Sequence, residues 1–300
     1  MRRILFLFAL AACLTSEASA QSRFNRRLPL APDGSIRIHN LAGIVRLHGW
    51  DRDSIVATGE VGRGSKGFFM GGDRNGVKLG IDIPNDDVTS AEPSTLEVWV
   101  PTGSRVRVKS TRGDIVVDGV TGALDLGSTS GNVTVTGIPR ELTVETMDGD
   151  VQLEGAVVWL RARSAGGDIT VRGGAEDLVS ASVSGAVTVT GGPVRAARLE
   201  TMTGNIVFEA SIARGAVLDL GTHSGAVRVL LPKGSTPTVE ATTVAAPIDN
   251  NLTPQRAQIR GDGRELALSL GGDARLTVRS FKGAVTLSWG GPPLKLVHRE

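Results

Sequence analysis

The chain has no tyrosine, and aromatic residues make up only 4% of its 300 residues. Aromatic rings are the bulkiest core fillers, so their scarcity argues against one thick hydrophobic core. The 39 glycines and the hydrophobic content of 40% instead suit small β-rich units stacked side by side. Nucleic-acid binding is not expected, because the basic residues are scattered among acidic ones and no stacking aromatics accompany them.

Cysteine is almost absent as well, and the single Cys13 cannot form an intramolecular disulfide. It lies in the N-terminal stretch MRRILFLFALAACLTSEASA, in which two arginines precede an apolar run from Ile4 to Leu14. The stretch ends in Ala18-Ser19-Ala20, a small-residue cleavage pattern. We therefore predict a secretory signal peptide over residues 1–20, followed by an N-terminal lead over residues 21–34.

No long hydrophobic run follows the signal peptide. About 20 apolar residues are needed to span a bilayer, and no later segment comes close. We expect a mature chain without a transmembrane segment, exported to the periplasm or the cell surface. Leu10-Ala11-Ala12-Cys13 resembles a bacterial lipobox, which leaves lipid anchoring at Cys13 open. We prefer Cys13 as an apolar residue of the signal, because the apolar run would otherwise be very short.

What the chain has in abundance is a repeat built around a glycine. Apolar residues stand two and four positions after each glycine, as Val151 and Leu153 do after Gly149, and this alternation predicts a strand with one buried face. Apolar residues seven and five positions before the glycine predict a second strand, and a serine or threonine stands three positions before it. The glycines are Gly113, Gly131, Gly149, Gly167, Gly185, Gly204 and Gly225, spaced 18, 18, 18, 18, 19 and 21 residues apart.

The fold class follows from the repeat length, because a half-repeat of about nine residues is too short to hold a helix. We predict an all-β parallel β-solenoid, of the β-helix or β-roll type, with about ten coils of roughly 18 residues and two strands each. The domain runs over residues 35–300, since the segments around Gly43, Ala246 and Gly283 fit the same frame. The period fails near residues 50–95 and 249–275, which are the expected insertions or end caps.

The register also predicts which charges face each other. Residues 18 apart lie about 4.8 Å from one another across a parallel ladder, so Arg107 is expected to meet Asp125, and Glu145 to meet Arg163. Each exposed pair contributes less than about 1 kcal/mol. The preferred interpretation is a solvated face whose charges help to set the register, and a ligand-binding face is the alternative.

The segment STRGDIVVDGVTGALDLGSTSGNVTVTG, preceded by LEVWVPTGSRVRV, resembles the bacterial putative-adhesin family of β-strand-repeat domains of unknown function. A V-P-x-G-S entry strand and repeated S-G-D/N-V-x-V-x-G units carry the resemblance, which covers roughly residues 35–290. The entry motif at Val98–Ser104 has an echo at Val229–Ser235. The resemblance implies a β-repeat fold in an exported or membrane-associated protein, and it supplies no catalytic residues.

The position after the repeat glycine holds mostly aspartate or asparagine. Calcium-binding β-rolls place paired aspartates in consecutive turns as G-G-x-G-x-D, but alanine at two of the seven turns breaks that motif. We therefore expect neither repeat-wide calcium nor another cofactor, and turn-forming side chains explain most positions. An isolated cation site at Asp148, Asp150 and Asp168 is left open. The seven residues are Asp114, Asn132, Asp150, Asp168, Ala186, Asn205 and Ala226.

A carboxylate pair on adjacent coils is the basis of an enzyme hypothesis. Asp150 and Asp168 are expected about 5 Å apart, close to the separation in retaining glycosidases. Any 18-residue repeat brings like residues that close, however. No cluster of aromatics accompanies the pair to stack on sugar rings, since the four tryptophans are far apart in the sequence.

Weaker motifs are set aside for physical reasons. Gly62–Gly67 matches the dinucleotide pattern G-x-G-x-x-G, but no helix start follows it. Phe68-Phe69-Met70 is expected to pack over a solenoid end rather than to dock a partner. Outward threonine pairs on two repeats are interrupted by Gln152 and Glu154, which argues against ice binding. The four histidines show no metal-ligand spacing.

Together these observations predict an exported, non-catalytic β-solenoid that acts as an adhesin or as a binding or scaffold protein of the cell envelope. Its partner is expected to be an envelope component, a protein or a polysaccharide. The alternative is a carbohydrate-active β-helix enzyme, a glycan lyase or hydrolase that uses carboxylates on adjacent coils. No catalytic, cofactor-binding or metal-binding residue is predicted.

Overall fold

The computed structural model describes residues 22–84 and 91–290. Over these ranges the protein is all-β: 24 strands belong to one hydrogen-bonded sheet, and no α-helix is present. Nor does any helix in this part of the chain have the length and apolarity needed to cross a membrane. The predicted signal peptide with Cys13, and residues 291–300 with His298, lie outside the described residues.

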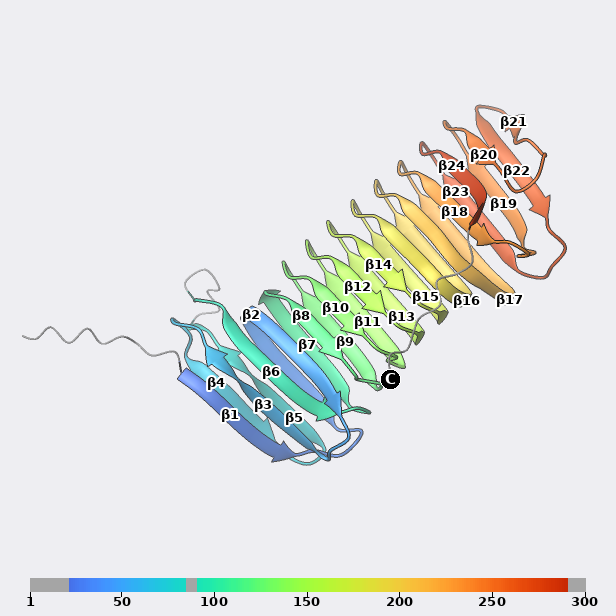
Figure 1. The fold of residues 1–300 in the computed structure, drawn as a ribbon. Helices are drawn as coiled ribbons and strands as arrows, with labels where there is room; N and C mark the ends of the chain where they lie inside the picture. Colours follow the sequence, from blue (N-terminus) through green and yellow to red (C-terminus); the bar gives the residue numbers. More distant parts are fainter. Residues whose placement is uncertain (1–21, 85–90, 291–300) are drawn as a thin grey trace, which may run out of the picture.

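The strands stand in two rows along one long axis, which we name face A and face B (Figure 1). Along face A the order is β4 (Gly67–Gly72), β5 (Gly76–Asp82), the first half of β2 (Ser35–Trp50), β7 (Arg105–Arg112), β9 (Ala123–Ser128), β11 (Glu141–Thr146), β13 (Val157–Ser164), β15 (Ala175–Ser182), the second halves of β16 (Val187–Thr201) and β17 (Ile206–Thr222), β23 (Arg275–Ser280), β19 (Thr238–Thr243), β22 (Gly263–Ser269) and β21 (Gln258–Arg260).

Along face B the order is β1 (Ser22–Pro29), β3 (Ser54–Val61), β6 (Ser94–Pro101), the second half of β2, β8 (Ile115–Asp118), β10 (Val133–Thr136), β12 (Val151–Glu154), β14 (Ile169–Arg172), the first halves of β16 and β17, β18 (Val227–Pro232), β24 (Val285–Gly290) and β20 (Ile248–Asn250). One coil is a face A strand, a turn and a face B strand.

The 18-residue period sets the register between neighbouring coils. Val151 pairs in parallel with Val133 on one side and with Ile169 on the other, so like residues stack on like. Side chains alternate along a strand, and a slip of one residue would turn every apolar side chain to the outside. In this register the inward residues form one continuous core, in which Val151 and Leu153 are at most 2% exposed.

The periodic serine or threonine is buried and closes the turn at the end of each face A strand. The Ser128 hydroxyl accepts a hydrogen bond from the Gly131 amide at 2.9 Å and donates to the Gly113 carbonyl of the preceding coil at 3.4 Å. Ser164 and Ser182 repeat both contacts in their own coils. The hydroxyls therefore supply partners to buried backbone groups of two successive coils.

At both ends of the stack, the order of the coils departs from the order of the chain. The coil formed by β2 is inserted between β5 and β6 on one side and β7 and β8 on the other. The coil of β23 and β24 is inserted in the same way between β17 with β18 and β19 with β20. Antiparallel strands β1, β3 and β4 cover one end, and β21 and β22 cover part of the other.

The two V-P-x-G-S-like motifs mark the places where the chain crosses an inserted coil. One leads from β6 to β7 past β2, and the other leads from β18 towards β19 past β23. Both turns have the same hydrogen bond, 3.0 Å from the Ser104 amide to the Pro101 carbonyl and 3.0 Å from the Ser235 amide to the Pro232 carbonyl. The sequence echo thus corresponds to a shared turn that spans two coil spacings.

The apolar stretch after Gly62–Gly67 forms part of the N-terminal end of the stack. Strand β4 follows Gly62–Gly67 directly, so this motif does not lead into a helix. The Phe68 ring stacks on Phe24 with 3.9 Å between the ring centroids, and both rings, with Met70, pack against the core. The expected packing of Phe68 and Met70 over an end is confirmed. Phe69 instead points outward from face A, beside Lys78.

Candidate functional site

A ladder of aspartate and asparagine side chains runs along the turns that lead into face B. The Asp150 carboxylate accepts a hydrogen bond from the backbone amide of Asp168 in the next coil at 2.8 Å. Asp114 and Asn132 accept from the next coil's amide in the same way, at 2.9 Å each. Asp168 is the last acceptor of the run and accepts from the Ala186 amide at 2.7 Å.

The ladder explains the alanines that interrupt the pattern. A residue that ends a run donates its amide to the preceding side chain without offering an acceptor to the next coil, and alanine is sufficient for that. Ala186 ends the first run, and Ala226 ends a second run in which Asn205 is the acceptor at 2.8 Å. The aspartates lie in turns, as expected, but their hydrogen bonds join successive coils instead of closing the local turn.

The same bonds define what the predicted carboxylate pair does. Asp150 and Asp168 lie on adjacent coils, and one oxygen of each carboxylate is engaged with the amide of the following coil. Asp148 is exposed and stands outside the ladder. Within residues 22–84 and 91–290, no group of three or more His, Cys, Asp or Glu side chains is arranged to hold a metal ion. The geometry gives the aspartate pair a structural role.

Replacing Asp168 by alanine is expected to destabilise the protein by about 1 kcal/mol, because the Ala186 amide loses its acceptor. Asp168→Asn is expected to change the stability by less than about 0.5 kcal/mol, because asparagine already fills this role at Asn132. Urea unfolding followed by circular dichroism measures both. Equal losses in the two variants would mean that the charge, and not the hydrogen bond, matters at this position.

Face B also carries a polar cluster that the sequence does not reveal. The half-buried His48 ring lies between two carboxylates, 2.6 Å from Asp118 through Nδ1 and 3.3 Å from Glu97 through Nε2. Its centroid is 5.3 Å from that of Trp99. These residues come from β2, β8 and β6, so the cluster fastens the inserted β2 coil to both neighbours. No periodicity could have indicated it, because the insertion itself brings the residues together.

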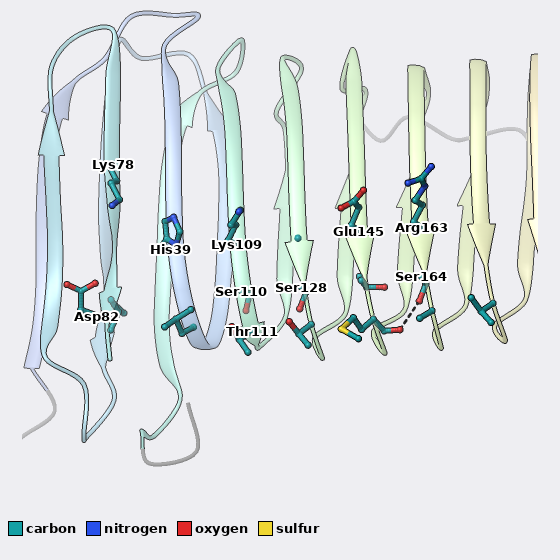
Figure 2. A pocket seen from close by; sticks show the side chains of 18 of the residues that line it. His39, Lys78, Asp82, Lys109, Ser110, Thr111, Ser128, Glu145, Arg163 and Ser164 are labelled. Carbon is teal, nitrogen blue, oxygen red and sulfur yellow. Dashed lines mark hydrogen bonds between the residues drawn. The ribbon is translucent and has the colours of Figure 1, made fainter. Parts of the chain in front are cut away.

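Face A carries a groove of about 990 Å³ that runs from β5 to the turn after β15 (Figure 2). Phe69 and Lys78, from β4 and β5, stand at its N-terminal end, with the Lys78 ammonium 5.5 Å from the centroid of the Phe69 ring. Two rows of outward-pointing residues line the groove. In the first row, Gly127 has no side chain and leaves space between its larger neighbours. The first row, which is mainly polar, consists of His39, Lys109, Gly127, Glu145 and Arg163.

The second row is formed by the residues that directly follow each buried serine or threonine, or Asn40 in the β2 coil. It is largely apolar. Met147 and Val183 are 57% and 56% exposed, and the row continues beyond the groove to Met202 at 53%. Reading the repeat one position beyond the hydroxyl would have shown this periodicity in the sequence. In stack order the row consists of Leu41, Thr111, Thr129, Met147, Ala165, Val183, Met202, His223, Phe281 and Val244.

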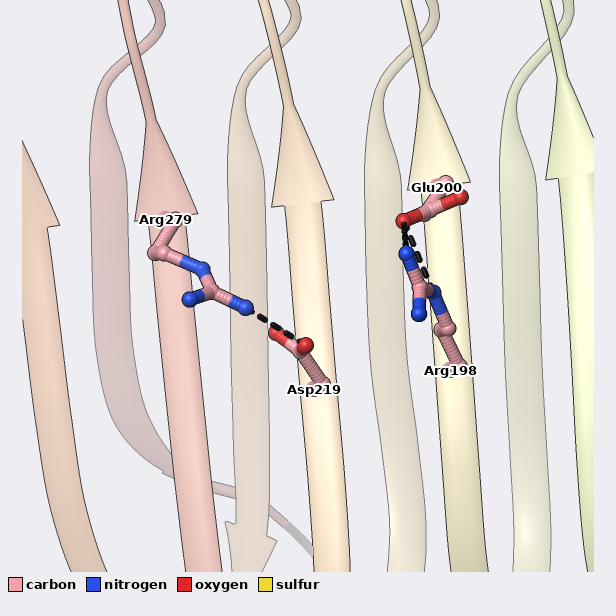
Figure 3. A network of polar contacts seen from close by, with 4 residues as sticks. All are labelled: Arg198, Glu200, Asp219 and Arg279. Atoms are coloured by element: carbon pink, nitrogen blue, oxygen red, sulfur yellow. Dashed lines mark hydrogen bonds and ion pairs between the residues drawn. The ribbon is translucent and has the colours of Figure 1, made fainter.

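Charges are paired differently in the groove and in the C-terminal half of face A. In the C-terminal half, Arg198 bonds Glu200 of the same strand at 2.6 and 2.8 Å, and Arg279 bonds Asp219 of the neighbouring coil at 2.5 Å (Figure 3). The groove, by contrast, is lined by three cationic side chains, Lys78, Lys109 and Arg163. Within the described residues, none of them forms an ion pair with a carboxylate.

The two charge pairs expected from the register have different outcomes. Arg107 and Asp125 are partners in the ladder and form the predicted ion pair, with 2.6 Å between Nε and Oδ2. Glu145 and Arg163 also meet as partners in the ladder, as predicted, but among the described residues no ion pair joins their side chains. All four side chains are exposed or half-exposed, so the ladder brings the charges together without fixing whether they pair, because an exposed pair gains little.

His39 is the histidine at the N-terminal end of the groove. Burial, and then the positive charges of Lys78 and Lys109, lower the pKa of His39 below its ordinary value of 6.5, against a smaller opposing effect of Asp82. The imidazole therefore takes up a proton less readily in the folded protein than in the unfolded chain. At neutral pH the positive charge at this end comes from the two lysines.

This lowered pKa predicts that His39 makes the fold less stable in acid. The stability loss begins as the pH falls through 6.5, where the unfolded chain binds the proton first, and it is complete below the folded-state pKa. The His39→Gln variant should therefore lose less stability than the wild type between pH 8 and pH 5, as measured by urea unfolding midpoints. An identical loss in both proteins would contradict the prediction.

Known proteins resemble this chain in part of its sequence and in its fold. Residues 102–173 match the family model described as Toastrack DUF4097, which confirms the predicted resemblance for that segment. No curated protein matches the sequence. A crystal structure described as a putative adhesin from Parabacteroides merdae is 11% identical, with a TM-score of 0.52, and the match covers 88% of this chain and 95% of that one.

Two further crystal structures are similar over comparable lengths. A putative adhesin from Bacteroides fragilis is 12% identical, with a TM-score of 0.45, covering 89% of this chain and 97% of that one. A protein from Parabacteroides distasonis described as a putative lipid binding protein is 11% identical, with a TM-score of 0.47, covering 88% and 96%. At these identities the likeness concerns the fold alone.

Proposed function

We propose that this chain is an exported, non-catalytic β-solenoid that binds a component of the cell envelope through face A, as an adhesin or scaffold does. The groove is the observation that carries the proposal. In the groove, cationic side chains lie beside an exposed apolar row, and within the described residues these cations have no ion-pair partner. Exposed apolar surface combined with convergent polar groups is typical of binding sites.

Two further observations support a binding role over catalysis. The aspartates of the enzyme hypothesis serve the turns, each accepting a backbone amide of the next coil. The stack is also built from repeated backbone hydrogen bonds and a continuous core, which give a rigid platform for a surface. Export is proposed from the signal peptide pattern of residues 1–20 and from the family resemblance.

Co-sedimentation with envelopes of the producing bacterium tests the binding role. Arg163→Glu reverses a charge in the groove and is expected to lower the retained fraction of the protein. Arg228→Glu, which reverses an equally exposed charge on face B, is the matched control and should be retained like the wild type. Equal retention of the two variants would contradict binding through face A.

The glycan-cleaving alternative has its own test, which the ladder makes sharper. In the Asp150→Asn, Asp168→Asn double variant the Oδ1 acceptors remain, so the fold is kept while both carboxylates are removed. Alanine would remove the acceptors as well. If the wild type releases reducing or unsaturated sugar ends from envelope polysaccharide and the folded double variant does not, the non-catalytic proposal is wrong.

A further inference from the structure

We propose that the groove on face A binds a single-chain anionic amphiphile of the fatty carboxylate class. Its acyl chain would lie along the apolar row from Val183 towards Leu41, and its carboxylate would meet Lys78 and Lys109. The inference rests on the proposed binding function, because it names the chemistry that the same groove recognises. Three properties of the groove support it: the length of its apolar row, the pairing of its backbone groups and buried hydroxyls within the protein, and its charge.

The apolar row has the extent that a long acyl chain needs. Leu41 and Val183 are five coil steps apart, which is about 24 Å at about 4.8 Å per step. Between them Met147 and Ala165 keep the row apolar, and the two threonines of the row add methyl groups. Because Met147 and Val183 are more than half exposed, covering them with a hydrocarbon chain removes apolar surface from water.

The backbone and the buried hydroxyls along the groove are already hydrogen-bonded within the protein. Its backbone groups are paired in the parallel ladders of β7, β9, β11 and β13. Its buried hydroxyls, such as Ser128 and Ser164, are engaged with glycine backbone groups of the turns. An extended peptide laid along the row would find these backbone groups already paired, whereas an acyl chain has no polar groups to satisfy.

The charges favour an anionic head at the N-terminal end. Lys78 and Lys109 flank His39 there, and neither lysine forms an ion pair within the described residues (Figure 2). Arg37 and Arg105, on the same face, also form no ion pair within those ranges. The carboxylates in the lining are Asp82 and Glu145. A carboxylate head would therefore complete charge-assisted hydrogen bonds with the two ammonium groups.

Calorimetric titration of palmitate, kept below its micelle-forming concentration, tests the inference. The full chain is expected to bind it saturably, and Met147→Asp with Val183→Asp to bind it at least about tenfold more weakly. Ile138→Asp with Val158→Asp is the matched control: those residues are 56% and 52% exposed but lie outside the groove, so binding should stay unchanged. Circular dichroism melting of each variant shows that all are folded.

The head is tested separately. Lys78→Glu with Lys109→Glu should weaken palmitate binding at least about tenfold, and hexadecyltrimethylammonium, a cationic amphiphile, should bind the wild type at least about tenfold more weakly than palmitate. Equal binding of both amphiphiles, or of the groove and control variants, would overturn the inference. Absence of palmitate binding would also overturn it. So would sedimentation showing that copies of the chain associate in solution and cover the groove. Envelope retention that depends on Arg163 without palmitate binding would leave the proposed function standing and remove only the ligand class.

Discussion

Replacing Gly149 by alanine is expected to destabilise the protein by about 3 kcal/mol or more. A Cβ at this position would lie 2.0 Å from the Gly131 carbonyl oxygen, 2.6 Å from its carbon and 3.2 Å from the Asn132 nitrogen. All three atoms belong to the backbone of the preceding coil, which cannot move without breaking its own ladder. The glycine is therefore required by the close approach of two coils.

Gly127→Ala is the matched control in the same region. Gly127 lies in strand β9 on face A, and the nearest atom to a Cβ added there would be the Val108 oxygen at 3.8 Å. Alanine there should be neutral or stabilise by about 0.5 kcal/mol, since glycine costs more conformational entropy in a strand. Urea unfolding of both variants decides: similar midpoints would show that the coils can separate to admit a methyl group.

Phe208→Ala is expected to destabilise the protein by about 3–5 kcal/mol, because it leaves a cavity in the core. Phe208 has no exposed surface and is the largest of the fully buried side chains. Its ladder neighbours Val189 and Val229 are smaller and are held in register by their own coils, so they cannot fill the space that the ring leaves. The free energy of urea unfolding measures the loss.

Phe281→Ala removes the same side chain from the surface and serves as its control. Phe281 is 44% exposed, and its ring stacks on His223 with 5.0 Å between the centroids. Its loss should cost about 1 kcal/mol, the contribution of one such aromatic pair. A cost for Phe281 equal to that for Phe208 would mean that the outer row, and not the inner columns, stabilises this part of the stack.

The candidate site could be predicted from the sequence only in part. Met147 and Val183 belong to a periodic position next to the hydroxyl, and their place in a row follows from the 18-residue register. Phe69 and Lys78 lie in the segment where the period fails, so no register could place them at the end of that row. The register placed exposed charges opposite each other but did not decide which of them form ion pairs: Arg107 and Asp125 do, and Glu145 and Arg163 do not within the described residues.

What the sequence alone determined is the repeating coil: which residues point inward, which hydroxyl and glycine make each turn, and which residues of successive repeats meet. These features are local or follow from a constant period, so alternation and spacing suffice to specify them. Only the tertiary structure decided the order of coils at both ends, where β2 and β23 are inserted between coils that lie elsewhere in the chain. Strand insertion depends on which distant edges are free to pair, and through it the His48 cluster and the end of the groove are assembled.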